Sequence, residues 1–192
     1  MEKKGIVIVN TGNGKGKTTA AFGQALRAVG HGSAVCIIQF IKGKWQTGEA
    51  KAVATCSDLI ELHICGTGFT WDAEHMDEVK RAAERGWELA RAKILSGDYK
   101  LVVLDEITYL LNYGLVSESE VFAALEDRPL GVNIVLTGRG AGPGLLALAD
   151  IVTEMREVKH CYGKGLRPVR GLSFKVGRCQ GRDPVLPVRR RA

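Results

Sequence analysis

The sequence predicts an α/β protein in which a mostly parallel sheet is flanked by helices on both faces. Three observations support this prediction. Short apolar runs alternate along the chain with segments of helical periodicity. The runs are apolar at successive positions, as in strands buried on both faces of a parallel sheet. A glycine-rich loop stands between the first apolar run and the first helical segment, where many parallel α/β proteins bind their ligands.

The expected strands follow one another without an internal repeat or a linker. They are GIVIVN (residues 5–10), SAVCIIQF (33–40), LIELHIC (59–65), KLVVLDE (100–106), VNIVLTG (132–138) and DIVTEM (150–155). In a parallel sheet the carboxyl ends of the strands share one edge, and ligands gather there. The loops after Asn10, Phe40, Cys65, Leu104 and Thr137 are therefore expected to form one rim, and each of them carries polar or glycine-rich sequence.

Three helices are expected from periodicity and capping residues. The first spans TTAAFGQALRAVG (18–30), and His31 is expected to close it rather than to bind a metal. Asp72 is expected to cap a long second helix with apolar positions three or four residues apart, namely Met76, Val79, Ala83, Trp87, Ala90 and Ile94. Ser117 and Glu120 form a capping box for a third helix, which holds Val121, Phe122 and Leu125.

Length and composition favour a single globular domain over residues 1–192, with a basic C-terminal segment from about residue 160. No apolar run approaches the roughly 18 residues of a spanning helix. The N-terminus enters a strand almost at once, which leaves no room for a signal peptide and predicts a cytoplasmic protein without membrane association. The five cysteines contain no C-x-x-C pair and are expected to be reduced, buried thiols.

The net charge of +6 is unevenly distributed. From Lys159 onward the chain carries ten basic side chains and one acidic one, Asp183, so residues 1–158 carry −3. This basic segment is interpreted as a solvated end or as an electrostatic attractor for an anionic ligand. Nucleic acid is not expected as the partner, because the tail lacks interleaved aromatic residues on which bases would stack.

The stretch TGNGKGKTT (11–19) has the spacing of a phosphate-binding loop, except that Thr11 replaces the first glycine. Such a loop needs backbone amides turned inward, an ammonium group that reaches phosphate, and a hydroxyl for Mg²⁺. Gly12, Gly14 and Gly16 supply the backbone freedom, Lys17 the ammonium and Thr18 the hydroxyl. The strand before the loop and the helix after it favour anion binding at the helix N-terminus.

The run LVVLDE places Asp105 and Glu106 at the carboxyl end of a strand. A carboxylate there is suited to hold Mg²⁺ directly or through water, opposite Thr18. The same pair leaves a second option open, in which Glu106 activates water for ATP hydrolysis.

Several stretches share their sequence and their order with one family. They are TGNGKGKTTAAFGQALRAVGHG, QFIKGKWQTGE, GTGFTW, LDEI with LLNYGL, RP, LTGRGA and ADIVTEMREVKH, between about Thr11 and His160. In this order they resemble the P-loop type of ATP:corrinoid adenosyltransferase. The threonine at the start of the loop is similar to the family's own version of the motif.

This resemblance implies a P-loop NTPase core of the RecA-like type, a homodimer, and an electron-donating reductase, such as a flavoprotein, as partner. The implied reaction transfers the 5′-deoxyadenosyl group of ATP to Co(I) of cobalamin or another corrinoid and releases triphosphate. By the same resemblance, ATP would be bound in the reverse direction compared with other P-loop proteins, so that C5′ would face the corrinoid. The ATP-binding residues would be Gly12, Asn13, Gly14, Lys15, Gly16, Lys17, Thr18, Thr19 and Arg139. Thr18 and Glu106, with Asp105, would bind Mg²⁺.

Two aromatic residues of GTGFTW, Phe69 and Trp71, are implied to contact the corrinoid and to displace its lower axial ligand, which eases reduction of Co(II). Phe69, Trp71 and Lys17 are therefore the expected catalytic residues. Because Co(I) is itself a strong nucleophile, the reaction needs no nucleophilic side chain and no general base. The protein has to align cobalt with C5′ and stabilise a charged leaving group. The alternative is that both aromatic residues fill a core.

Two other functions remain open from the residues alone. A P-loop ATPase or kinase would use Glu106 to activate water or an acceptor hydroxyl and would release phosphate or ADP. A regulatory module would bind nucleotide or corrinoid without turnover, although intact Lys17, Thr18 and Glu106 argue against it.

Overall fold

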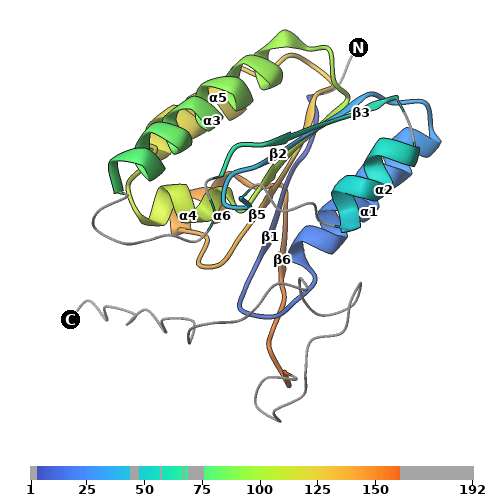
Figure 1. The fold of residues 1–192 in the computed structure, drawn as a ribbon. Coiled ribbons are helices and arrows are strands. Elements are labelled where there is room, and N and C mark those ends of the chain that lie inside the picture. Colours follow the sequence, from blue (N-terminus) through green and yellow to red (C-terminus); the bar gives the residue numbers. More distant parts are fainter. Residues whose placement is uncertain (1–3, 44–47, 57, 67, 69–75, 161–192) are drawn as a thin grey trace. The chain divides into compact units, whose positions relative to one another are not determined.

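The computed structural model describes residues 4–43, 48–56, 58–66, 68 and 76–160. Strands and helices alternate along this part of the chain (Figure 1). The elements are β1 (Val7–Thr11), α1 (Lys17–Gly30), β2 (Val35–Gln39), α2 (Gly48–Cys56), β3 (Ile60–Ile64), α3 (Met76–Ser96), β4 (Leu101–Asp105), α4 (Ile107–Asn112), α5 (Glu118–Glu126), β5 (Asn133–Thr137), α6 (Pro143–Leu148) and β6 (Ile151–Glu154).

The described strands form one six-stranded sheet in the order β3-β2-β4-β5-β1-β6. Every pair of neighbouring strands is parallel. Helices α1 and α2 cover one face of the sheet, and α3, α4, α5 and α6 lie on the other (Figure 1). This arrangement confirms the predicted α/β fold. Since all strands run in one direction, the loops that follow them share one edge of the sheet, as the sequence predicted.

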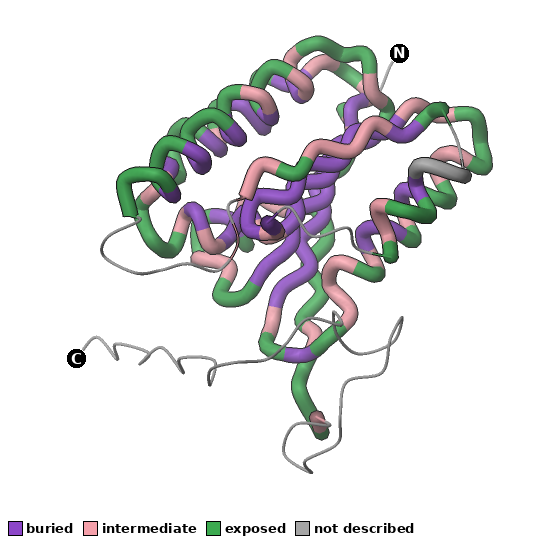
Figure 2. Tube along the Cα trace, viewed as in Figure 1, coloured by how far each residue is buried: buried purple, intermediate pink, exposed green. Residues whose placement is uncertain are grey.

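Each face of the sheet packs its own hydrophobic core. Successive residues of a strand point to opposite faces, so Ile38 packs towards α3 whereas Ile37 packs towards α1. The central strands are buried along their whole length (Figure 2). Burying one Ile or Leu side chain contributes about 1.5–3 kcal/mol, more than the roughly 1 kcal/mol of a helix cap. The two cores therefore dominate the stability of the fold.

The expected helix ends are found where the structure describes them. The backbone amide of His31 donates to the Ala28 carbonyl at the end of α1, 3.0 Å away, which confirms His31 as the closing residue. The capping box of α5 is present, with the Glu120 amide donating to Ser117 Oγ at 3.2 Å. The expected apolar positions of α3 are buried except Met76, which is 40% exposed in the first turn. Asp72, its expected cap, lies outside the described residues.

Strand β6 departs from the expectation that the strands are buried on both faces. All four of its residues are exposed, with Ile151 at 45% and Val152 at 44% (Figure 2). The reason is its place at the edge of the described sheet, where it pairs with β1 alone. Its apolar sequence correctly predicted a strand but gave the wrong burial.

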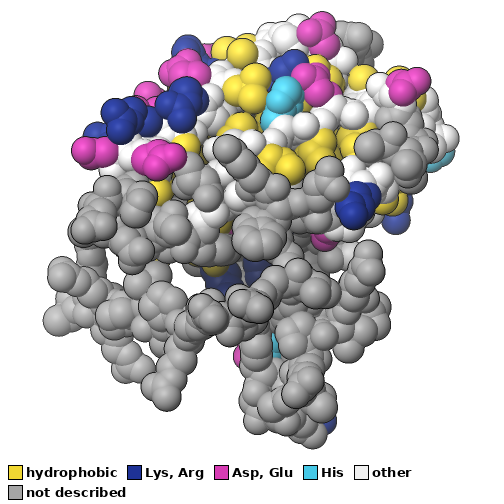
Figure 3. All heavy atoms as spheres, in the orientation of Figure 1, with side chains coloured by type: hydrophobic (Ala, Val, Ile, Leu, Met, Phe, Trp, Pro, Cys, Tyr) yellow, Lys and Arg dark blue, Asp and Glu magenta, His cyan; other side chains and the backbone are white. Residues whose placement is uncertain are grey.

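The fold described above belongs to one compact unit, Met1–Lys159. The assignment of a single domain to residues 1–192 stays a prediction. Among the described helices none has the length and hydropathy required to cross a bilayer. On the face shown in Figure 3, acidic and basic side chains are interspersed, so the described part of that face carries no large patch of one charge.

Candidate active site at the carboxyl edge of the sheet

The glycine loop between β1 and α1 folds back against the chain that follows β6. The amide of Gly14 donates to the carbonyl oxygen of Met155 at 2.6 Å. Gly12 has a positive φ of 95°, and a Cβ atom there would lie 2.5 Å from the same carbonyl oxygen. Backbone strain and close approach together require glycine at this position.

Thr11 does not need the freedom of the glycine that it replaces. It is the last residue of β1, and its carbonyl accepts a hydrogen bond from the Met155 amide at 2.8 Å. Its side chain oxygen accepts another from the Ala141 amide at 3.2 Å. Positive φ begins only at Gly12. A threonine is therefore compatible with this loop because it belongs to the strand and not to the turn.

Helix α1 begins at Lys17 and leaves its first amides available to an anion. Gly16 precedes the helix in a left-handed conformation, with φ of 116°, and no side chain caps the helix. Backbone amides at such a terminus favour negative charge. The Lys17 ammonium donates to the carbonyl oxygens of Gly12 and Gly14, at 2.6 and 2.7 Å. The lysine therefore lies directly over the loop that would surround phosphate.

Charged groups of both signs surround the Lys17 ammonium. Burial lowers the pKa of Lys17, and the positive charge of Arg139 lowers it further. Glu106, Asp105 and Glu157 act in the opposite direction. The fold thus brings residues from the first helix and from the ends of β4 and β5 to one place.

Asp105 is the centre of a buried hydrogen-bond network at the end of β4. Its side chain is fully buried, and its Oδ1 accepts hydrogen bonds from the hydroxyls of Thr18 (2.8 Å) and Thr137 (2.7 Å). Its Oδ2 accepts from the Gln39 amide group at 2.8 Å and pairs with the Lys42 ammonium at 3.1 Å. Both carboxylate oxygens are thus engaged by groups from three parts of the chain, namely α1, β5, and β2 with the residues that follow it, so Asp105 fixes their positions relative to one another.

Glu106 follows Asp105 in a strained backbone conformation. Its φ of 67° is positive, which among the described non-glycine residues is unique to this position. The Glu106 amide donates to Thr137 Oγ1 at 2.9 Å. Burial lowers the pKa of Lys17 and raises that of Tyr109, and the negative charge of Glu106 acts upward on both. Strain of about 1–3 kcal/mol in a non-glycine residue is typical of functional sites.

Arg139 is held at the same edge by the residues around its backbone. Its carbonyl oxygen accepts hydrogen bonds from Thr108 Oγ1 at 2.8 Å and from the Asn112 side chain at 3.1 Å. The Arg139 side chain is exposed. Burial lowers the pKa of Lys17 and raises that of Tyr109, and the positive charge of Arg139 acts downward on both. Arg139 therefore reaches into the region where the phosphate loop and Glu106 meet.

An apolar pocket lies beside this region, at the carboxyl ends of β2 and β3. Its lining consists of Phe40, Ile41, Gly66, Gly68, Val79, Ala82, Ala83, Leu110 and Leu115. Phe69 and Trp71, the expected corrinoid contacts, follow Gly68 along the chain but lie outside the described residues.

The structure brings most of the expected site residues together: Gly12, Gly14, Gly16, Lys17, Thr18, Asp105, Glu106 and Arg139. Asn13, Lys15 and Thr19 lie on the exposed side of the loop and of the first helical turn. Sequence reasoning missed Gln39, Lys42 and Thr137. All three residues lie in stretches that carry the family resemblance, QFIKGKWQTGE and LTGRGA, but those stretches do not indicate a contact with Asp105.

Comparisons with known proteins agree with this geometry. Residues 3–174 match the family described as ATP:corrinoid adenosyltransferase BtuR/CobO/CobP. The chain is 42% identical to the corrinoid adenosyltransferase of Escherichia coli (strain K12), over 91% of this chain and 88% of that protein. It is 42% identical to the corrinoid adenosyltransferase CobA of Salmonella typhimurium over the same shares of the two chains. For the Pseudomonas aeruginosa corrinoid adenosyltransferase the identity is 39%, over 90% and 85%.

A solved structure supports the fold independently. The flagellar accessory protein FlaH from Methanocaldococcus jannaschii superposes with a TM-score of 0.51 at 11% identity, covering 80% of this chain and 72% of that chain. Together with the parallel sheet and the phosphate loop, this likeness confirms the predicted P-loop, RecA-like core. The match over residues 3–174 and the 39–42% identity to whole relatives then decide the family. The chain belongs to the ATP:corrinoid adenosyltransferase family.

Proposed function

We propose that this protein transfers the 5′-deoxyadenosyl group of ATP to the Co(I) centre of a corrinoid and releases triphosphate. The observation that carries the proposal is the family match over residues 3–174, in a chain that keeps the phosphate loop with Lys17. The alternative of a P-loop ATPase or kinase is not favoured, because the relatives are corrinoid adenosyltransferases. The product of the reaction distinguishes the two.

In this reaction the nucleophile is the substrate's own cobalt. Co(I) attacks C5′ of ATP, the bond between C5′ and the triphosphate oxygen breaks, and its electron pair remains on that oxygen. The protein has to hold the two substrates in line and stabilise the leaving group. The loop amides, Lys17 and Arg139 are the groups that we assign to the triphosphate, since they surround one point at the start of α1.

The oxygen atoms beside Lys17 suit Mg²⁺, which prefers hydroxyl, carboxylate and water ligands. We assign Thr18 and Glu106 to the ion, which when bound would neutralise charge on the triphosphate. Asp105 is already engaged by four side chains, including the Thr18 hydroxyl at 2.8 Å and Lys42 at 3.1 Å. We therefore assign to Asp105 mainly the role of orienting Thr18, which together with Glu106 would bind the ion.

Oligomeric state, cellular location and electron donor are also part of the proposal. On the basis of the family resemblance we propose a homodimer in the cytoplasm and a reductase, such as a flavoprotein, that supplies the electron for Co(II). Cobalamin is the corrinoid substrate in the experiments below.

Replacing Glu106 with glutamine is expected to reduce turnover and weaken its dependence on Mg²⁺. The variant keeps the size of the side chain but removes the charge that faces Lys17. Triphosphate and phosphate are to be measured separately, with and without reduced cobalamin, in the wild type, Glu106→Gln and the exposed control Glu84→Gln. Fast hydrolysis of ATP to phosphate in the wild type without corrinoid, lost in Glu106→Gln, would establish the ATPase instead.

Replacing Phe69 and Trp71 with alanine is expected to change activity according to how cobalt is reduced. If both residues displace the lower ligand of the corrinoid, the double variant should keep substantial activity with Co(I) prepared chemically. Its activity should collapse with Co(II) and a mild biological reductant, because the lower ligand then keeps the metal hard to reduce.

The control for this experiment is Trp87, a core residue that is 3% exposed. Truncating a buried aromatic residue costs about 3–5 kcal/mol, so Trp87→Ala should lower Tm strongly and both activities alike. If the double variant at Phe69 and Trp71 behaves like Trp87→Ala in Tm and in both assays, these aromatic residues fill a core.

A further inference from the structure

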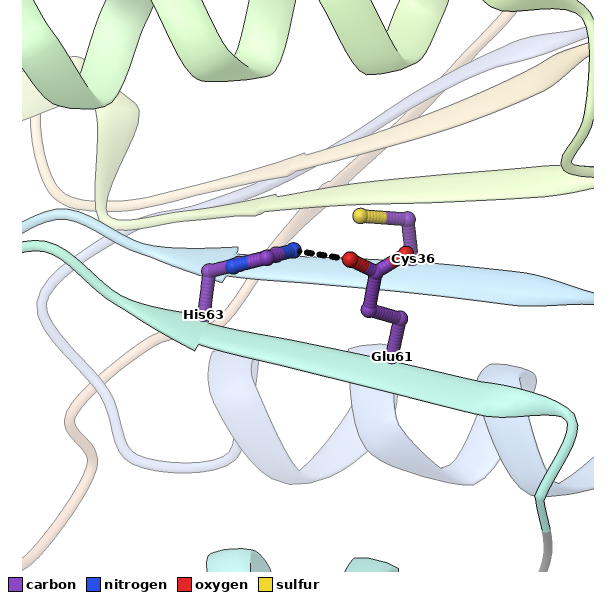
Figure 4. A group of neighbouring side chains, drawn as sticks. All are labelled: Cys36, Glu61 and His63. Atoms are coloured by element: carbon purple, nitrogen blue, oxygen red, sulfur yellow. Dashed lines mark hydrogen bonds and ion pairs between the residues drawn. The ribbon is translucent and has the colours of Figure 1, made fainter.

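Three side chains with metal-binding atoms meet on the face of the sheet that α3 covers, away from the phosphate loop. They are Cys36 on β2 and Glu61 and His63 on β3 (Figure 4). One ligand atom from each lies within 4.8 Å of those of the other two. His63 Nε2 and Glu61 Oε1 are 2.7 Å apart and share a hydrogen bond. The cluster combines a thiol, an imidazole and a carboxylate, and none of them has a role in the proposed reaction.

The pairing of β2 with β3 brings the three side chains together. Cys36 and Glu61 are direct partners in the register of β2 and β3, and His63 follows Glu61 by two residues, on the same face. Cys36 is fully buried, whereas the side chains of Glu61 and His63 are 39% and 27% exposed. A rigid pair of strands thus carries the ligand atoms, and the cluster is open to solvent on the side of β3.

We propose that Cys36, Glu61 and His63 form a binding site for a transition-metal ion of the Zn²⁺ type. Thiolate, imidazole and carboxylate are the ligands that Zn²⁺ takes, and three of them leave a fourth position for water. Mg²⁺ and Ca²⁺ are not expected here, because a sulfur ligand selects softer ions. The proposal revises the sequence-based expectation that Cys36 is only a core thiol.

Two neighbouring side chains would support the carboxylate ligand. Lys93 from α3 donates to Glu61 Oε1 at 2.9 Å and to Oε2 at 3.0 Å, and the Tyr99 hydroxyl donates to Oε2. Lys93 and Tyr99 are able to keep Oε2 while Oε1, now bonded to His63, turns to the metal. Hydrogen bonds of this kind to a ligating carboxylate are common around bound metals.

Metal binding at this site replaces protons. The ion would take the place of the proton between His63 Nε2 and Glu61, with the neutral imidazole then carrying its proton on Nδ1, and would release the proton of the Cys36 thiol to solvent. Burial, with the charge of Glu61 as a smaller cause, raises the pKa of Cys36 to about 12. The metal therefore has to offset an unfavourable deprotonation and the loss of one Lys93 contact, so moderate affinity is expected.

The site is separate from the proposed nucleotide site. Cys36 precedes Gln39, which contacts Asp105, by three residues of one strand. At about 3.3 Å per residue Cys36 lies roughly 10 Å from Gln39 along the strand. Since successive residues of a strand point to opposite faces, the side chains of Cys36 and Gln39 also lie on opposite faces of the sheet. A bound ion would instead tie β3, at the edge of the described sheet, to β2. We therefore expect a contribution to stability that is independent of the adenosyl transfer.

The test is a titration of the reduced, full-length protein with Co²⁺ as a spectroscopic probe for Zn²⁺. The wild type should show a thiolate-to-cobalt charge-transfer band that saturates with one ion per chain and disappears when Zn²⁺ is added. Cys36→Ser should lose the band. Glu61→Gln and His63→Gln should weaken Co²⁺ binding by more than the roughly 10- to 100-fold that follows loss of a supporting hydrogen bond. Zn²⁺ should raise Tm in the wild type but not in His63→Gln.

Matched controls are Cys65→Ser, a half-buried thiol outside the cluster, and His31→Gln at the end of α1. Both should bind Co²⁺ like the wild type. The proposal is overturned if the wild type shows no charge-transfer band, or if the band survives in Cys36→Ser. Equal losses in Cys65→Ser also overturn it. If Cys36→Ser does not fold, as judged by circular dichroism, Co²⁺ binding by His63→Gln decides the result. The His63 side chain is 27% exposed, so its replacement should leave the fold intact.

Discussion

Replacing Lys17 with alanine is expected to lower kcat by about two to three orders of magnitude, the loss typical for one preorganised charge contact to a developing anion. The ammonium lies over the loop, 2.6 and 2.7 Å from the carbonyl oxygens of Gly12 and Gly14. From there it reaches a triphosphate at the start of α1. Because the leaving group gains charge as the bond to C5′ breaks, the loss should appear in kcat and not only in KM.

The fold should survive the change at Lys17, since its hydrogen bonds go to loop carbonyls that solvent can reach once the side chain is removed. Steady-state kinetics and a thermal melt of Lys17→Ala are to be compared with those of Lys80→Ala, an exposed lysine on α3. Lys80→Ala should match the wild type in both. Wild-type kcat in folded Lys17→Ala would remove the lysine from the mechanism.

Replacing Asp105 with alanine is expected to lower the free energy of unfolding by about 3–5 kcal/mol, as when one partner of a buried ion pair is removed. The carboxylate is fully buried and accepts from Thr18, Thr137 and Gln39 as well as from Lys42. All four groups would lose their common acceptor. Urea denaturation monitored by circular dichroism measures the loss.

Two further variants separate this network from a general effect of removing an aspartate. Asp98→Ala, in the exposed loop between α3 and β4, should change the free energy of unfolding by no more than about 0.5 kcal/mol. Combining Asp105→Ala with Lys42→Met should recover part of the loss, because the partly buried Lys42 ammonium is then not left without its partner. A loss below about 1 kcal/mol in Asp105→Ala would contradict the network as described.

The sequence was sufficient to predict the strands and the long helices. The apolar runs of β1, β2, β4 and β5 are buried at nearly every position, so hydrophobicity alone located them. Helices α4 and α6 have six residues each, too few for a helical period to stand out. Helix α2 was missed as well, since its small residues form no clear apolar stripe.

The candidate site was predictable as far as it is continuous in sequence. The spacing of Gly16, Lys17 and Thr18 identified the phosphate loop, the end of the run LVVLDE identified Asp105 and Glu106, and the family motifs added Arg139. What could not be predicted depends on how the strands pair. Gln39 reaches Asp105 because the two residues are partners in the register of β2 and β4, and no local pattern encodes that register.

The same limit explains why the fixed role of Asp105 was not foreseen. The sequence shows two adjacent carboxylates, and both were assigned to Mg²⁺. In the structure they differ sharply, since Asp105 ends β4 inside a closed network whereas Glu106 turns away from the strand at a φ of 67°. The positive φ of Glu106 therefore gives the two adjacent carboxylates different roles. Asp105 positions its neighbours, whereas Glu106 faces Lys17.

The most direct test of the proposed function is to incubate the full-length protein with ATP, Mg²⁺ and chemically reduced cob(I)alamin, and to quantify every product. Formation of adenosylcobalamin can be followed by its absorption spectrum, and the nucleotide products by anion-exchange chromatography. The account predicts one triphosphate for each adenosylcobalamin, and little phosphate or ADP when the corrinoid is omitted. Corrinoid-independent release of phosphate and ADP, without formation of a cobalt–carbon bond, would contradict it.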